Sequence, residues 1–216
     1  MLAGVPARSR LLAPAALVAA LALVPAPASA GRDRCAAAGT KTVKQTSAVR
    51  VFGLTRGETT RYYGCLRSTG RRVRVAITFN DSESLSSGRV RTVLIAGTNV
   101  GVITSGFDDI GVDGSEFEGL AVANLARRGR VYRTGISTND EDQYDGFAKL
   151  ILRADGAAAW VVAANGGYGE VDVLAPTAKR PTPVAYAKAI DEGSLAFGGD
   201  GVTWVQAGTT QTAAIP

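Results

Sequence analysis

The sequence predicts an all-β protein built from about a dozen short antiparallel strands. Most segments alternate apolar and polar residues with a period of two, which is the pattern of a strand with one buried face. Glycine-containing turn dipeptides separate these segments, and no segment beyond the first thirty residues combines a 3.6-residue period with a helix cap. Of the 216 residues, 46% are hydrophobic and 20% charged, so the composition indicates a folded domain rather than a disordered chain.

The first thirty residues have the three-part layout of a secretory signal peptide. Two arginines precede the apolar run Leu11–Val24, and Ala28 and Ala30 are the small residues of an A-x-A cleavage site. The run is shorter than the roughly 20 residues that span a bilayer, although an uncleaved anchor is the alternative. We therefore expect cleavage between Ala30 and Gly31, and a secreted, extracytoplasmic protein with no membrane span after cleavage.

The alternating segments follow one another along residues 31–216, the expected all-β domain. In residues 72–79, for example, valine, isoleucine and phenylalanine point to one face while arginine, alanine and threonine point to the other. Pro181 and Pro183 weaken the best helix candidate, residues 182–189. We expect strands at residues 42–46, 48–54, 60–67, 72–79, 90–96, 100–104, 119–126, 130–134, 148–153, 158–163, 170–174, 194–197, 202–205 and 209–215.

The C-terminal part contains an internal repeat. Residues 150–161 and 195–205 each form a predicted strand, an Asp-Gly turn and a second strand that carries Trp-Val. A period of 40–45 residues with about four strands per unit is typical of propeller blades, and the turn glycines show such spacing: Gly70, Gly114, Gly156 and Gly201. The prediction is an antiparallel, propeller-like β-repeat of about four blades, whose closure would protect strand edges. A β-sandwich is the alternative.

Three segments also resemble a known group of proteins. They are Ala48–Phe52, the run Tyr63–Arg71, and Gly193–Leu195 leading to Thr203–Trp204. Together they resemble secreted β-propeller-like proteins of unknown function from high-G+C bacteria. The resemblance implies a β-repeat fold over most of the mature chain, and it implies no activity.

The chain has only two cysteines, Cys35 and Cys65. In the expected oxidising compartment they indicate a disulfide bond rather than two free thiols. Closing a loop of about 30 residues would stabilise the fold by roughly 3.5 kcal/mol in the loop-entropy model. A catalytic cysteine is disfavoured because the chain has no histidine to activate it.

The absence of histidine also excludes several kinds of site. A histidine-dependent catalytic triad and a histidine-ligated zinc site are impossible, and two cysteines cannot form a Cys₄ site. The chain contains no G-x-S-x-G, S-x-x-K or P-loop motif. We therefore expect no cofactor and no metal, and we name no catalytic residue.

Charge is distributed unevenly along the chain. Residues 31–77 hold 11 basic and two acidic residues, whereas residues 78–216 hold 11 basic and 17 acidic ones. The simplest interpretation is that these arginines form the solvent-facing half of alternating strands. The alternative is a surface for an anionic envelope polymer or polysaccharide, with nucleic acid a less favoured partner outside the cell.

Two acidic clusters lie in glycine-rich stretches, at residues 108–118 and 139–146. They comprise Asp108, Asp109, Asp113, Glu116 and Glu118, and then Asp140, Glu141, Asp142 and Asp145. Solvated loops are the simplest interpretation, but clustered carboxylates can bind calcium, and a facing pair can hydrolyse a glycosidic bond. Tyr62, Tyr63, Trp160 and Trp204 lie inside alternating runs, where aromatic residues are usually core or cross-strand partners.

The sequence thus favours a non-catalytic secreted β-repeat protein that acts as a binding or structural module at or beyond the cell envelope. The alternative is a secreted carbohydrate-active hydrolase that uses a carboxylate pair drawn from the two acidic clusters.

Overall fold

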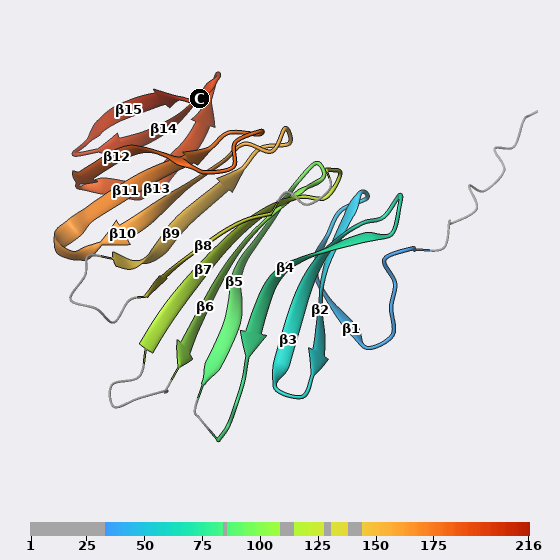
Figure 1. Cartoon of the computed structure of the whole chain (residues 1–216). Helices are drawn as coiled ribbons and strands as arrows, with labels where there is room; N and C mark the ends of the chain where they lie inside the picture. The colour runs from blue at the N-terminus through green and yellow to red at the C-terminus, as the bar shows by residue number, and fades with distance from the viewer. Residues whose placement is uncertain (1–32, 84–85, 109–114, 128–130, 138–143) are drawn as a thin grey trace, which may run out of the picture. The chain divides into compact units, whose positions relative to one another are not determined.

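The computed structural model describes residues 33–83, 86–108, 115–127, 131–137 and 144–216 (Figure 1). These residues are all-β, as predicted, and form four small antiparallel sheets of three or four strands. The predicted cleavage site between Ala30 and Gly31 lies outside the described residues. Within the described ranges, no helix has the length and apolarity that a membrane span requires.

Each sheet is a meander in which strands adjacent in sequence pair with one another. The first sheet contains β1 (Thr40–Gln45), β2 (Val49–Arg56), β3 (Thr59–Leu66) and β4 (Arg71–Phe79). The second contains β5 (Ser87–Ala96), β6 (Asn99–Asp108), β7 (Ser115–Asn124) and β8 (Val131–Ser137). The third contains β9 (Tyr144–Leu152), β10 (Ala158–Ala164), β11 (Tyr168–Leu174) and β12 (Thr182–Lys188). The fourth contains β13 (Ile190–Gly198), β14 (Gly201–Gln206) and β15 (Thr209–Ala214).

The internal repeat corresponds to equivalent hairpins. Residues 150–161 span the β9–β10 turn and residues 195–205 span the β13–β14 turn, so both join the first two strands of a sheet. Gly70 lies instead between β3 and β4, the third and fourth strands of the first sheet. Its regular spacing from Gly156 and Gly201 therefore reflects no structural equivalence.

The weak helix candidate at residues 182–189 is wrong, because residues 182–188 form strand β12. This strand pairs with β11 at the edge of the third sheet. An edge strand tolerates proline because one side of its backbone has no ladder partner. Pro183 lies at a register shift opposite Asp172, where the regular ladder is already interrupted. Pairing with β11 thus outweighs the local preference of this segment.

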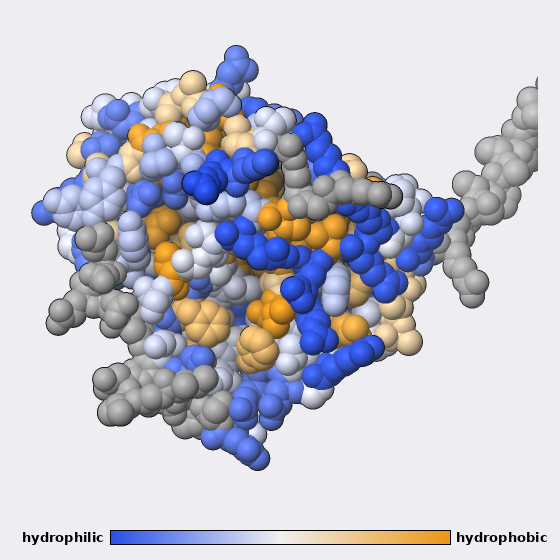
Figure 2. Space-filling view, viewed as in Figure 1, coloured by the Kyte–Doolittle hydropathy of each residue, from blue (hydrophilic) through white to orange (hydrophobic). Residues whose placement is uncertain are grey.

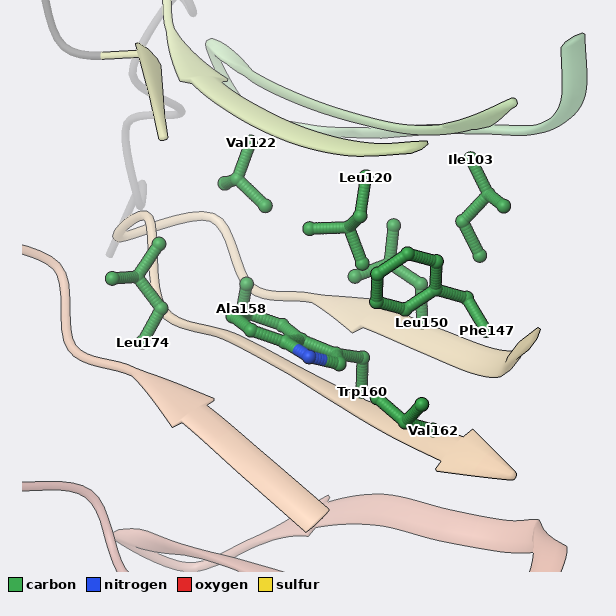
Figure 3. Close-up of a cluster of buried hydrophobic side chains, with 9 residues drawn as sticks. All are labelled: Ile103, Leu120, Val122, Phe147, Leu150, Ala158, Trp160, Val162 and Leu174. Carbon is green, nitrogen blue, oxygen red and sulfur yellow. The ribbon is translucent and has the colours of Figure 1, made fainter. Parts of the chain in front are cut away.

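Hydrophobic clusters join successive sheets. One unites Val49, Val51 and Val75 of the first sheet with residues of the second. Another lies between the second and third sheets, where Trp160 and Phe147 pack against Leu120 (Figure 3). A further cluster joins the third and fourth sheets and contains the following residues: Ala159, Val161, Val171, Val173, Leu195, Val202 and Trp204. The core is thus divided into layers, each made by two facing sheets.

Candidate functional site

The strands of the first sheet carry an unusual excess of positive charge. They contain eight basic residues, two each on β1 and β2, one on β3 and three on β4, and no acidic residue. In the part of the chain that the structure describes, the ion pairs are Arg67–Asp33, Arg91–Glu118 and Arg153–Asp155. None of the eight strand residues therefore has a carboxylate partner there.

Strand alternation gathers five of these residues on one face. Val49 and Val51 of β2 point toward the second sheet, so Arg50 and Phe52 point to the opposite side. Cross-strand pairing with β3 and β4 places further arginines on that side, near the rings of Phe52 and Tyr63. We call this surface the basic face, and its arginines are Arg50, Arg56, Arg61, Arg72 and Arg74. Apart from Arg50, these arginines are exposed. Four arginines thus lie on the solvent side of alternating strands, as the simplest interpretation expects, whereas Arg50 is half-buried.

Two aromatic rings underlie the arginines of the basic face: Phe52 is buried and Tyr63 is half-buried. Phe52 and Tyr63 are cross-strand partners, and their ring centroids are 5.7 Å apart. The guanidinium carbons of Arg50 and Arg72 lie 5.2 and 5.6 Å from the Phe52 ring centroid. Cation–π contacts of this kind contribute about 0.5–1 kcal/mol each at exposed sites, and they fix the guanidinium planes against the sheet.

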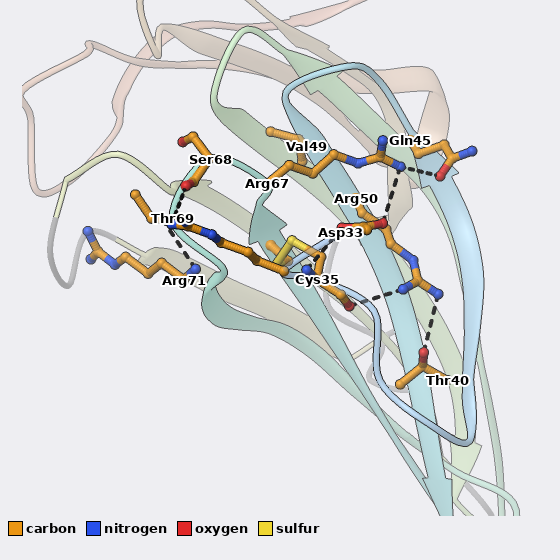
Figure 4. The surroundings of a disulfide bond; sticks show 12 residues. Asp33, Cys35, Thr40, Gln45, Val49, Arg50, Arg67, Ser68, Thr69 and Arg71 are labelled. Atoms are coloured by element: carbon orange, nitrogen blue, oxygen red, sulfur yellow. Dashed lines mark hydrogen bonds and ion pairs between the residues drawn. A yellow bond between two sulfur atoms is a disulfide. The ribbon is translucent and has the colours of Figure 1, made fainter. Parts of the chain in front are cut away.

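The predicted disulfide, Cys35–Cys65, is confirmed and anchors the segment before β1 to this face (Figure 4). Its Cα atoms are 5.8 Å apart, and both cysteines are fully buried. Arg50 donates to the Cys35 carbonyl at 3.0 Å and to the Thr42 hydroxyl at 2.9 Å. Arg50 is therefore a structural residue, whereas Arg72 is exposed and its guanidinium lies over the Phe52 ring.

A cavity of about 340 Å³ opens beside the aromatic pair. It is lined by Ala37, Ala38, Thr40, Phe52, Leu54, Arg56, Tyr63 and Arg72. The walls thus combine apolar surface with two exposed guanidinium groups. Hydrophilic residues also gather over the first and second sheets in the space-filling view, with hydrophobic atoms visible between them (Figure 2). Such a surface can bind an anion that has an apolar or ring-shaped body.

The structure brings parts of the two acidic clusters together. Glu116 and Glu118 of the first cluster and Asp145 of the second line one cavity of about 420 Å³, together with Arg89 and Arg91. Asp108, another member of the first cluster, accepts a hydrogen bond from the Ser86 hydroxyl at 2.8 Å. The remaining members, Asp109, Asp113, Asp140, Glu141 and Asp142, lie outside the described residues. Among the described residues, no group of three or more acidic or cysteine side chains could hold a metal ion.

Glu118 has a structural role in this cavity. Its carboxylate is buried, forms an ion pair with Arg91 and accepts a hydrogen bond from the Phe147 amide at 2.6 Å. A Cβ at Gly146 would lie 2.8 Å from the Glu118 carboxylate, so only glycine leaves room for this contact. The carboxylate thereby links the second sheet to the third.

A second carboxylate, Asp172 on β11, lies in an unusual environment. Burial, followed by repulsion from Glu170, raises the pKa of Asp172 to about 6. Glu170 accepts a hydrogen bond from the Tyr144 hydroxyl at 2.9 Å, and this bond raises the pKa of Tyr144 to about 12. Neither carboxylate stands out in the sequence, because an E-x-D pair on an alternating strand resembles an ordinary solvent-facing pattern.

The aromatic residues named from the sequence have structural roles. Trp160 and Trp204 are only 1% and 5% exposed and belong to the core, as predicted. Tyr132 stacks on Trp160 with ring centroids 5.5 Å apart. Tyr62 packs against the cluster between the first and second sheets, and only Tyr63 reaches the basic face.

Comparison with known proteins returned no relative. No family model matches the chain, no curated protein matches it, and no solved structure matches it.

Proposed function

We propose that this chain is a non-catalytic, secreted binding module and that the basic face of its first sheet binds an anionic polysaccharide of the cell envelope. The observation that carries this proposal is the eight basic residues on β1–β4 that have no carboxylate partner among the described residues. An unneutralised basic surface attracts polyanions, and the disulfide fits an oxidising compartment.

The chemistry of the face favours a polymer with sugar rings. Arginine donates paired hydrogen bonds to carboxylate, sulfate or phosphate groups, while aromatic and apolar walls contact the ring faces of sugars. Arg56 and Arg72 line the same cavity as Tyr63, so charge and ring surface are offered side by side. The spread of arginines along the strands of one sheet suits a repeating ligand rather than a single small anion.

The test is the affinity for polygalacturonate, measured by biolayer interferometry with immobilised polymer. An arginine near an anionic surface contributes about 1 kcal/mol, so the double variant Arg56→Ala/Arg72→Ala should bind roughly 10- to 30-fold more weakly. Raising the salt from 0.05 to 1 M should abolish binding, because the screening length falls from more than 10 Å to about 3 Å. Dextran, a neutral polysaccharide, should not bind.

Arg180→Ala is the matched control, because Arg180 is equally exposed but lies outside the first sheet. It should bind as the unchanged protein does. Binding that survives 1 M salt, or that falls equally in both variants, would contradict the proposal. A stronger response to poly(glycerol phosphate) than to polygalacturonate would support the basic face as the binding surface but would identify the ligand as a phosphate polymer.

We also infer that the four sheets are blades of a propeller-like repeat. The support is that every sheet is an antiparallel meander and that hydrophobic clusters join the sheets in sequence order. A closed ring requires contact between the first and fourth sheets. Carbodiimide cross-linking should then join Lys41 or Lys44 to Asp191, Glu192 or Asp200, and the absence of such cross-links would favour an open arrangement.

A second candidate function is polysaccharide hydrolysis at the cavity that Glu116 and Asp145 share. The observation in its favour is that the two acidic clusters meet there, beside the rings of Phe107 and Phe117. Incubation with a panel of reducing-end-labelled polysaccharides tests it. Turnover that is abolished by Glu116→Gln or Asp145→Asn would establish a hydrolase. No turnover of any substrate in the panel would contradict the hydrolase, and the proposed binding function would then be the only one of the two to stand.

A further inference from the structure

The fourth sheet has one strand fewer than the other three, and its last strand has a free edge. Its strand order is β13-β14-β15, so β15 pairs with β14 on one side and with no described strand on the other (Figure 1). Such an edge presents a row of unpaired backbone N–H and C=O groups that can bind a further strand. Proteins usually block this pairing with charged side chains, prolines or bulges on the edge strand.

β15 lacks the features that protect the other described edges. The four sheets have two edges each, and every edge strand except β15 carries at least one charged residue. Register shifts also interrupt the pairing of β1, β4, β5, β9, β12 and β13. β15 reads Thr-Thr-Gln-Thr-Ala-Ala, without charge or proline, and it pairs regularly with β14 along its whole length. It is therefore the edge on which a further strand meets the least obstruction.

The turn before β15 fixes the direction of its backbone groups. Ala207 and Gly208 have φ of +48° and +79° and form the two-residue turn between β14 and β15. In a hairpin of this kind the flanking residues, here Gln206 and Thr209, exchange both of their backbone hydrogen bonds. Bonded and non-bonded pairs then alternate along the rest of the ladder.

This alternation directs every second residue of β15 to the free edge. The Ile215 amide donates to the Asp200 carbonyl at 3.4 Å, just beyond the strand, as the alternation from Thr209 requires. The residues at the intervening positions therefore point their N–H and C=O groups away from β14, and all three are exposed: Thr210, Thr212 and Ala214.

We propose that two copies of this chain associate by antiparallel pairing of their β15 strands about a two-fold axis at Thr212. Thr212 of each copy would exchange backbone hydrogen bonds with Thr212 of the other, and Thr210 would pair with Ala214 of the other copy. Every outward-facing residue of both strands then has a partner, and the two fourth sheets become one continuous sheet. The protected edges of the remaining strands would limit the association to two copies.

The composition of β15 favours a second copy as the occupant of this edge. A two-fold antiparallel pair brings each residue close to the same residues of its partner, so a charge on the strand would meet a like charge. β15 carries no charge, and its central residue is a β-branched threonine, which pairs well across a ladder. Thr212 is also the cross-strand partner of Thr203, so pairing would extend a row of threonines across both copies.

The experiment is sedimentation of the disulfide-intact protein between about 5 and 500 µM, combined with amide hydrogen exchange over the same range. An interface this small lies at the weak end of protein affinities, so we expect a reversible dimer with a dissociation constant on the order of 10 µM. By mass action the monomer fraction then falls about sixfold across the range. Exchange of the Thr212 amide should slow by the same factor, whereas exchange of the Gln211 amide, which faces β14, should change far less.

Charged variants at Thr212 test the position of the axis. Thr212→Lys and Thr212→Glu should each weaken self-association at least about fivefold, because like charges would lie opposite each other. An equimolar mixture of the two variants should form a heterodimer, because opposite charges would then meet at the axis. Thr182→Lys makes the same change at an exposed residue of the edge strand β12, and this matched control should dimerise as the unchanged protein does.

A protein that remains monomeric at about 500 µM would overturn the proposal, because mass action would then have populated the dimer. Assemblies larger than a dimer would contradict it as well, because they would require pairing at other edges. Dimerisation that is unaffected by Thr212→Lys, or a mixture of the two charged variants that stays monomeric, would place the contact elsewhere. Exchange at Thr212 is measured on the unchanged protein, so the proposal is tested even if a variant does not fold.

Discussion

Removal of the disulfide offers the sharpest test of how the first sheet is held together. The bond closes a loop with a sequence separation of 30 residues. For that length the loop-entropy relation gives about 3.6 kcal/mol at 25 °C. Both cysteines are fully buried against Phe52, so a replacement by alanine keeps an apolar contact and adds little cavity cost. We expect Cys35→Ala/Cys65→Ala to lower the free energy of unfolding by about 3–4 kcal/mol.

The assay is urea unfolding followed by tryptophan fluorescence, with the m-value checked for constancy. In a domain of this size 1 kcal/mol corresponds to roughly 2–4 °C, so the melting temperature should fall by about 7–14 °C. Reduction of the unchanged protein should give the same loss, and denatured, unreduced protein should show no free thiol. A loss below about 1 kcal/mol would refute the reasoning, because the segment before β1 would then be held by contacts other than the bond.

Three further predictions concern the interior. Burial raises the pKa of Asp172 in the folded protein to about 6, from 3.8, so the folded state favours the protonated carboxyl group. The contribution of Asp172 to the free energy of unfolding is therefore present near pH 4 and is lost as the pH rises through about 6. Partial exposure reduces the effect to roughly 1 kcal/mol, and Asp172→Asn should remove this slope from a plot of unfolding free energy against pH. Trp160→Ala should cost about 3–5 kcal/mol in chemical denaturation, whereas Tyr186→Ala, at an exposed ring, should cost less than about 1 kcal/mol. Arg91→Ala should cost about 2 kcal/mol, because it leaves the buried Glu118 carboxylate without its cation; an unchanged melting temperature would contradict this.

Local patterns in the sequence predicted much of the fold. Period-two alternation identified every strand except β12, because burial of one face imposes that pattern directly. The Asp155-Gly156 turn before Trp160 was also correct, and Gly156 has the positive φ that a tight hairpin needs. The hairpin before Trp204 was placed one residue too late, because Gly198 pairs with Gly201 and the turn residues are Gly199 and Asp200. Strand β12 was missed because its prolines argue against a strand unless it lies at an edge, and edge position is a tertiary property.

The sites were less predictable because they depend on contacts between distant residues. The carboxylate of Glu118 meets Arg91 across 27 residues, and Asn99 is held by the carbonyl of Ala154 across 55. Contacts between residues this far apart in the sequence do not produce a local sequence motif. The basic face could be predicted in part. The excess of arginine is evident in the sequence, but register shifts such as that between Tyr62 and Tyr63 decide which arginines lie on the same side of the sheet.

The most direct measurement of the central proposal is a map of amide chemical shifts on titration with galacturonate oligomers at low salt. Binding by the basic face predicts perturbations concentrated on β2, β3 and β4, strongest around Arg56 and Arg72, and their loss at 1 M salt. Perturbations centred on the third or fourth sheet, or no perturbation at any concentration tested, would contradict the proposal that the first sheet is the binding surface.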